Sequence, residues 1–251
     1  MKNVIVKKDF IDVSILKTLN DDLLNNLKVF LEKGTHLGGK KYGHLNATIG
    51  HHAKTILKEI KKKGLLELIA EEYDLILEEY FLTCACNINL PGSKKQHIHR
   101  DTNFDDSKII INIPLVDVNE DNGSIEVYPG SNEVPLSFLD FLLSKNKYPP
   151  KRINTSLGDI FVRDSNLFHR GMDNLSRSPR SMVAITLSKK DIATPSEIEA
   201  PFGGGKIDFM NNWFEDNLFG KIMENIYMYF PAIRSIKRIL ASLIKEKNLS
   251  T

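Results

Sequence analysis

Short strand-like runs separated by turn residues fill the chain from about residue 75 to residue 187, and this pattern constrains the fold more than any other feature. Within residues 80–90 the side chains alternate between an apolar and a polar face, namely Leu82, Cys84, Cys86 and Ile88 against Thr83, Ala85, Asn87 and Asn89. Further strands are predicted at 107–116, 124–128, 159–163 and 180–187, with a short helix at 136–144. Several short strands with Gly and Pro between them predict a β-sandwich or barrel.

Helical spacing of apolar residues marks the segments on either side of this β region. The spacing runs from Leu16 to Leu31, and it returns from Ala53 to Ile60 before Gly64. Residues 225–247 repeat it after a glycine-rich loop at 203–206. We therefore expect one domain over residues 1–251, of a mainly β class with flanking α. It has helical support at 1–74, a β core with the functional site at 75–190, and a loop with C-terminal helices at 191–251.

Composition excludes several classes of protein. The hydrophobic fraction of 41% and the charged fraction of 26% are typical of a globular protein, and a net charge of +2 argues against nucleic acid as a partner. No apolar run approaches the roughly 18 residues of a transmembrane helix, and the first ten residues lack the apolar stretch of a secretory signal. Cys84 and Cys86, two apart in a strand, are poor disulfide partners, so we expect a reducing, cytoplasmic location.

One group of residues carries the chemistry. His99 and Asp101 stand one residue apart after the turn Pro91-Gly92, and His169 follows a later strand. Two imidazoles and one carboxylate form the facial triad that binds non-haem Fe(II) and leaves coordination positions open. An H-x-D pair alone is weak evidence, but strand ends on a rigid scaffold are where such ligands belong. Arg180 adds the planar cation that a dicarboxylate co-substrate would need.

Four stretches carry a resemblance to a known family. They are Gln96-x-x-His99-Arg100-Asp101; the segment 122–132, Asn-Gly-Ser-Ile-Glu-Val-Tyr-Pro-Gly-Ser-Asn; Gly158-Asp159 with His169 behind it; and His169-x-Gly171-x-x-Asn174-x-Ser176-x-x-x-Arg180. Over about residues 80–190 the chain resembles the phytanoyl-CoA hydroxylase family of Fe(II)/2-oxoglutarate-dependent oxygenases. Asn132 stands where the family usually has His, and we expect this position to lie outside the iron site.

The resemblance implies a double-stranded β-helix core of the jelly-roll, cupin-like type. It implies that His99, Asp101 and His169 bind Fe(II), that Arg180 pairs with the C5 carboxylate of 2-oxoglutarate, and that Gln96 also contacts this co-substrate. The implied reaction uses O2, decarboxylates 2-oxoglutarate to succinate and CO2, and hydroxylates an unactivated C–H bond of a small molecule. A threonine that some relatives use is Ile125 here, so that contact is expected to be absent. The carboxylate of Asp101 leaves no position for a chloride ligand, so halogenation is not expected.

Two other functions stay open at this point. One is a cupin-type metal-binding barrel, an isomerase or binding protein that uses no 2-oxoglutarate. The other is peripheral membrane contact through a C-terminal helix with an apolar stripe at Ile233, Ile236, Leu240 and Leu243, although packing of this stripe on the barrel or on a second subunit is the favoured interpretation. The sequence does not indicate the oligomeric state or the substrate. An anionic substrate would suit the basic residues near the expected mouth, which are Lys40, Lys41, Arg100, Arg163 and Arg170.

The remaining histidines and cysteines have simpler expected roles. His97 would share a face with His99, but the triad is complete without it. His51 and His52 open a helix and are expected to be solvated, whereas a substrate role and a surface role are equally expected for His36 and His44, which flank the loop at 38–44. Core packing is expected for Trp213, Cys84 and Cys86. The opposite face of the 80–90 strand, with Thr83 and Asn87, is a candidate lining of the cavity.

Overall fold

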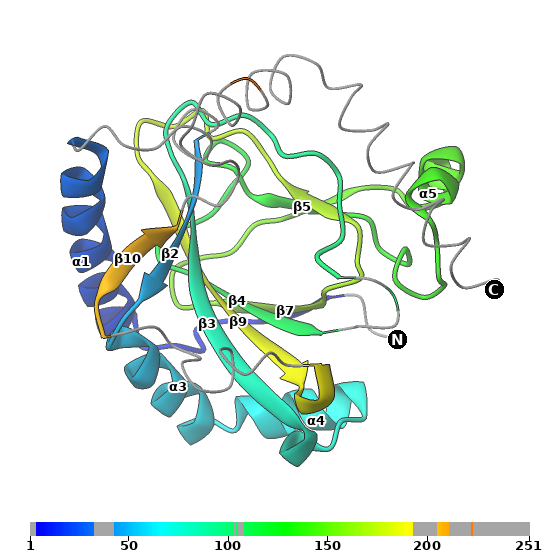
Figure 1. The fold of residues 1–251 in the computed structure, drawn as a ribbon, viewed down its shortest axis with the longest axis horizontal. Coiled ribbons are helices and arrows are strands. Elements are labelled where there is room, and N and C mark those ends of the chain that lie inside the picture. The colour runs from blue at the N-terminus through cyan, green and yellow to red at the C-terminus, as the bar shows by residue number, and fades with distance from the viewer. Residues whose placement is uncertain are drawn as a thin grey trace.

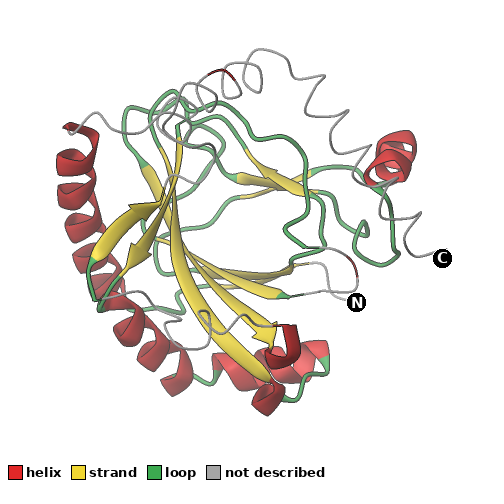
Figure 2. Cartoon of the chain, viewed as in Figure 1, coloured by secondary structure: helices red, strands yellow, loops and turns green. Residues whose placement is uncertain are grey.

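The computed structural model describes residues 4–32, 43–102, 104, 108–192, 205–210 and 222, and these form two antiparallel sheets with helices outside them (Figures 1 and 2). The larger sheet has the strand order β1-β7-β4-β9-β3-β2-β10 and the smaller one β6-β5-β8. The strands are β1 (Val4–Lys7), β2 (His44–Ile49), β3 (Tyr80–Asn89), β4 (Ile109–Pro114), β5 (Ile125–Val127), β6 (Lys151–Ile153), β7 (Ile160–Asp164), β8 (His169–Gly171), β9 (Arg180–Lys189) and β10 (Ile207–Met210). The helices are α1 (Val13–Glu32), α3 (His52–Lys62), α4 (Leu65–Tyr73) and α5 (Phe138–Ser144), with 3-10 turns at Leu77–Glu79, Lys145–Lys147 and Lys190–Ile192.

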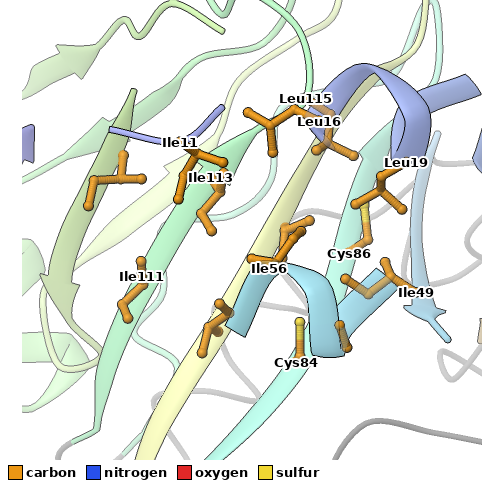
Figure 3. Close-up of a cluster of buried hydrophobic side chains, with 14 of the residues drawn as sticks. Ile11, Leu16, Leu19, Ile49, Ile56, Cys84, Cys86, Ile111, Ile113 and Leu115 are labelled. Carbon is orange, nitrogen blue, oxygen red and sulfur yellow. The ribbon is translucent and has the colours of Figure 1, made fainter. Parts of the chain in front are cut away.

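Helices α1, α3 and α4 cover one face of the larger sheet, and the smaller sheet lies across its other face (Figure 1). The covered face carries the apolar side chains of each strand, because alternate residues of a strand point to opposite faces. In Figure 3, Leu16 and Leu19 of α1 and Ile56 of α3 pack over strands β3 and β4. The strand side chains labelled in this core are Ile49 of β2, Cys84 and Cys86 of β3, and Ile111 and Ile113 of β4.

The strands predicted from alternation are confirmed to within a few residues, as is the helix predicted at 136–144. The prediction that residues 1–74 are helical is wrong in part, because β1 pairs with β7 and β2 pairs with β3 in the larger sheet. Likewise β10, which pairs with β2, lies in the 191–251 segment that was expected to hold only a loop and helices. These strands are short, and their partners are distant in sequence, so local periodicity carries little signal for them.

Several expectations concern residues outside the described ranges. The helix expected at 225–247 with its apolar stripe, Trp213, His36, Lys40 and Lys41 all lie there. The extent of the domain over 1–251 stays a prediction. Within the part of the chain that the structure describes, no helix is both long and apolar enough to cross a membrane.

Candidate functional site

The segment from Gln96 to Asp101 runs alongside β8 and brings the predicted ligands together. The backbones of His99 and His169 exchange two hydrogen bonds, of 2.9 and 2.8 Å, as directly opposed residues of an antiparallel pair do. Two further bonds extend the pairing: the amide of Gln96 donates to Gly171 O at 2.8 Å, and the amide of Asp101 donates to Ser165 O at 2.9 Å. The ligand segment is therefore an extension of the smaller sheet, and the backbone fixes its register.

Three donor atoms converge at this point. Oδ1 of Asp101 lies 3.5 Å from Nε2 of His99 and 3.6 Å from Nε2 of His169. Each imidazole is held from behind, because Nδ1 of His99 bonds the carbonyl of His97 at 2.7 Å and Nδ1 of His169 bonds the carbonyl of Leu167 at 2.9 Å. A carbonyl oxygen can only accept a hydrogen bond, so Nδ1 is the donor in both contacts, and in the neutral imidazole this leaves the Nε2 lone pair for a metal. The donor set fits Fe(II) in a facial arrangement.

The protonation states match what a metal requires. Burial alone would raise the pKa of Asp101, but nearby His169, Arg163 and His99 hold that pKa well below its usual range. Burial and the charge of Arg163 hold the pKa of His169 well below its usual range as well, and Asp101 only partly offsets this. A charged carboxylate and a neutral imidazole are the forms that coordinate a metal, so Asp101 and His169 fit that role.

A cavity of about 480 Å³ lies between the two sheets and is lined by all three triad residues. Its floor is the inner face of the larger sheet, where register places side chains in cross-strand rows. One row is His44, Asn89 and Arg180 on β2, β3 and β9. Another, six residues or roughly 20 Å further along β9, is Thr83, Thr186, Ile110 and Arg163. Thr83 and Asn87 line the cavity, as the alternation of the 80–90 strand predicts.

Arg180 is a buried cation at one end of this floor, with 3% of its surface exposed. Its Nη2 donates to the carbonyl of Gly123 at 3.0 Å, and its Nε has no hydrogen-bond partner. Burial lowers the pKa of Arg180 to about 10, so it stays protonated at neutral pH. No carboxylate of the described residues forms an ion pair with it. A buried charge of this kind is costly without an anion, so the site fits an anionic ligand.

Gln96 lies at the same end of the cavity. Its Oε1 accepts the amide hydrogen of Gly171 at 2.8 Å, which orients the side chain on the cavity wall. Because the carbonyl oxygen is occupied in this way, the amide NH2 is the group that remains to meet a ligand. The structure thus brings together all five residues assigned to the site from the sequence.

His44 is a cavity residue that the sequence did not single out, because surface and substrate roles were equally expected for it. It is buried on β2, where Nδ1 lies 2.8 Å from Oδ1 of Asn89 and Nε2 lies 2.6 Å from the carbonyl of Lys94. Burial holds its pKa below the usual range, opposed by the Lys94 carbonyl and reinforced by Arg180. Its only sequence signal was its position at the end of the loop at 38–44.

The expectation that His52 is solvated is wrong. His52 is buried, and its Nε2 forms a hydrogen bond with Oδ2 of Asp22 at 2.8 Å that ties α3 to α1. Exposed His51 lies beside it, and these two histidines with Asp22 form a second group of metal-type ligands at the surface. The His52–Asp22 pair already has a structural role, as a link between two helices.

Other basic and histidine side chains near the site point elsewhere. His97 does not line the cavity. Arg170 pairs with Glu126 at 2.8 Å, and the guanidinium of Arg100 lies over the ring of Phe168. Asn132 is buried outside the cavity lining and donates to Asp164, as expected for a position away from the iron site.

Comparison with known proteins gives the fold and the family. The chain is 24% identical to Dioxygenase cdmD of Talaromyces verruculosus over 163 residues, which cover 59% of this chain and 52% of that protein. It is similar to the crystal structure of AviO1 from Streptomyces viridochromogenes Tue57, with a TM-score of 0.60, 16% identity, and coverage of 77% and 92% of the two chains. It is also similar to the epimerase SnoN in complex with Fe3+, alpha ketoglutarate and nogalamycin RO, with a TM-score of 0.53, 14% identity, and coverage of 75% and 79%.

These likenesses confirm the double-stranded β-helix fold that the sequence resemblance implied. The family model for phytanoyl-CoA dioxygenase (PhyH) matches residues 33–182, which is more than half of the chain and includes the triad, Gln96 and Arg180. The chain belongs to the phytanoyl-CoA dioxygenase family.

Proposed function

We propose that this protein is an Fe(II)/2-oxoglutarate-dependent oxygenase that hydroxylates an unactivated C–H bond of a small molecule. The observation that carries the proposal is the pairing of two features on one cavity. The triad offers three converging metal ligands, and buried Arg180 offers a cation without a carboxylate partner among the described residues. A dicarboxylate that chelates a metal at one end needs a cation at its other end.

Each residue has a defined task in this reaction. His99, Asp101 and His169 would hold Fe(II) on one face and leave the opposite positions open. When bound, iron and 2-oxoglutarate supply the oxidative decarboxylation to succinate and CO2 and the oxidising power for C–H hydroxylation. Arg180 would bind the distal carboxylate of the co-substrate, and the amide NH2 of Gln96 would contact the same molecule. The cavity between the sheets gives the co-substrate and the substrate room beside the triad.

Hydroxylation is favoured over two alternatives. A cupin-type isomerase or binding protein without a co-substrate has no use for a buried, unpaired Arg180. Halogenation needs a coordination position for a halide, and the carboxylate of Asp101 occupies that position. The similar protein SnoN is an epimerase, so analysis of the product has to distinguish an inserted oxygen atom from an inverted stereocentre.

The test is anaerobic reconstitution with Fe(II) and 2-oxoglutarate, followed by exposure to O2. We expect the visible charge-transfer band that a chelated Fe(II)–2-oxoglutarate pair gives, and then release of succinate. A screen of small molecules for faster succinate release would find the substrate, and mass spectrometry of the product would detect one added oxygen. Metal binding without the band, and with no succinate, would favour the cupin-type alternative instead.

A further inference from the structure

Arg163 is a second buried cation of the cavity, far from Arg180 along the sheet. It lies on β7 with 5% of its surface exposed and lines the cavity. Its Nη2 donates to Oδ2 of Asp101 at 2.8 Å, whereas Nε and Nη1 have no hydrogen-bond partner. A guanidinium has five N–H donors, and buried donors without partners are costly. The proposed co-substrate does not account for this residue, because Arg180 already serves the distal carboxylate.

Lys108 places a second positive charge on the same side of the cavity. Its backbone pairs with Ser165: the amide of Lys108 donates to Oγ at 2.8 Å, and its carbonyl accepts from the amide of Ser165 at 2.8 Å. Ile110 is the cross-strand partner of Arg163, and Lys108 is two residues before it, so it is the diagonal neighbour of Arg163. Both residues line the cavity, and no carboxylate among the described residues forms an ion pair with Lys108.

The described residues that line the cavity leave this end positive. The described lining holds the cations Arg163, Lys108 and Arg180 and a single carboxylate, that of Asp101. Fe(II) and the 2-oxoglutarate dianion would cancel each other. When Asp101 coordinates the metal, part of its negative charge is shared with the metal. Asp101 then neutralises less of the positive charge of Arg163 than their ion pair alone would. A cavity lined by one sign of charge attracts the opposite sign.

The floor between the two ends combines apolar side chains, those of Ile110, Met182 and Ala184, with polar ones. Thr83, Asn87, Asn112 and Thr186 line the cavity, and no hydrogen bond of their side chains to other described groups is found. A bound hydrocarbon chain would leave these amides and hydroxyls without partners and without water, which is unfavourable. A molecule with hydroxyl or amide groups would satisfy them.

We propose that Arg163 and Lys108 form a binding subsite for the carboxylate or phosphate group of a small hydrophilic substrate. The inference rests on the proposed function, since it takes the triad and Arg180 to be occupied by iron and 2-oxoglutarate. The acid group of the substrate binds at the Arg163 end of the cavity. The polar body of the substrate extends from there over the floor and toward the triad. Arg163 then touches both the substrate and Asp101, so it orients the substrate relative to the metal.

The experiment is anaerobic calorimetric titration of the Fe(II) protein, saturated with 2-oxoglutarate, with glycerol 3-phosphate, glycerate and glycerol. We expect at least one of the two anions to bind and glycerol not to bind, and the preferred anion tells phosphate from carboxylate. Arg163→Met should weaken binding about tenfold or more, because a charge-assisted hydrogen bond is lost. Lys108→Met should weaken it about threefold, since its charge is more screened. Arg163→Lys should recover part of the loss, and Lys54→Met on the exposed side of α3 should change nothing.

The variants separate this inference from the proposed function. The charge-transfer band of each protein reports iron and co-substrate binding, and Lys108 touches no metal ligand, so its variant tests the subsite even if Arg163→Met disturbs Asp101. An intact band with no binding of either anion to the wild type overturns the subsite alone. The subsite is also overturned if the anion binds with equal affinity to the wild type, to Lys108→Met and to Arg163→Met. A wild type without the band overturns the proposed function, whatever the anions do.

Discussion

Asp101 uses its two carboxylate oxygens for different partners: Oδ2 accepts a hydrogen bond from Nη2 of Arg163 at 2.8 Å, and Oδ1 faces both histidine Nε2 atoms. Arg163 belongs to the larger sheet, whereas Asp101 ends the segment that extends the smaller one. The contact therefore orients the metal-binding oxygen from across the cavity. A ligand held from behind in this way binds its metal with less loss of side-chain freedom.

Replacement of any triad residue by alanine should remove metal binding while the fold persists. For His99→Ala, Asp101→Ala and His169→Ala we expect the Fe(II) affinity to fall by more than about 100-fold, beyond the effect of changing a residue that only supports a ligand. Turnover should fall with it. Metal titration and circular dichroism measure the two properties, and His97→Ala is the control because His97 does not line the cavity. Full activity in any one variant would remove that residue from the site.

Replacement of Arg180 should affect the co-substrate and not the metal. Arg180→Met should raise the KM for 2-oxoglutarate at least about tenfold, since loss of one partner of a buried charge pair costs roughly 2–5 kcal/mol. Arg180→Lys should recover little, because an ammonium lacks the planar fork that matches a carboxylate. The exposed Arg177→Met is the matched control. If Arg177→Met loses 2-oxoglutarate binding and Arg180→Met keeps it, the assignment of the anchor is wrong.

Asp159 should make stability depend on pH. Its buried carboxylate accepts hydrogen bonds from Lys8 at 2.6 Å and from the backbone amides of Asp9 and Ser156. Burial opposes these contacts, but the bonds from Lys8, Ser156 and Asp9 win and hold the pKa of Asp159 below its ordinary value. A group with a lowered folded-state pKa stabilises fully above its unfolded pKa of about 3.9, and this stabilisation is lost as the pH falls through the folded-state pKa.

Asp159→Asn should therefore reduce the free energy of unfolding by roughly 1–3 kcal/mol at neutral pH. Its deficit relative to the wild type should shrink as the pH falls below about 4. Urea unfolding at a series of pH values measures the difference, with Glu71→Gln on the exposed side of α4 as the control. If the difference in the free energy of unfolding between Asp159→Asn and the wild type stays constant down to the lowest pH measured, the charge of Asp159 is not its cause.

The two thiols should be unreactive in the native protein. Cys84 and Cys86 are free and buried in the core between β3 and the helices, and burial raises the pKa of both. Only a thiolate attacks a disulfide reagent, so Ellman's reagent should label neither cysteine until denaturant is added and then label both. Rapid labelling of either thiol in the folded protein would contradict the packing role.

The elements that could be predicted from the sequence are those with a strong local pattern of residues. The alternation of Thr83, Cys84, Cys86 and Asn87 correctly separated the core face of β3 from its cavity face. The convergence of the three triad residues was also predicted, because the family motifs around them are specific although an H-x-D pair alone is weak evidence.

Strand register could not be predicted, because it depends on partners that lie far apart in sequence. Register is what places His44 opposite Asn89 and Arg163 opposite Ile110, so the sequence could not decide between a surface role and a cavity role for His44. The same reason explains the burial of His52, whose partner Asp22 lies on a different helix.

The two anchors proposed for 2-oxoglutarate come from different sheets. The metal ligands lie on the smaller sheet and its extension, and Arg180 belongs to β9 of the larger one. A co-substrate that bridges them would act as a removable cross-link between the two layers of the barrel. Since a ligand stabilises the state that binds it, iron and 2-oxoglutarate together should raise the melting temperature more than either does alone.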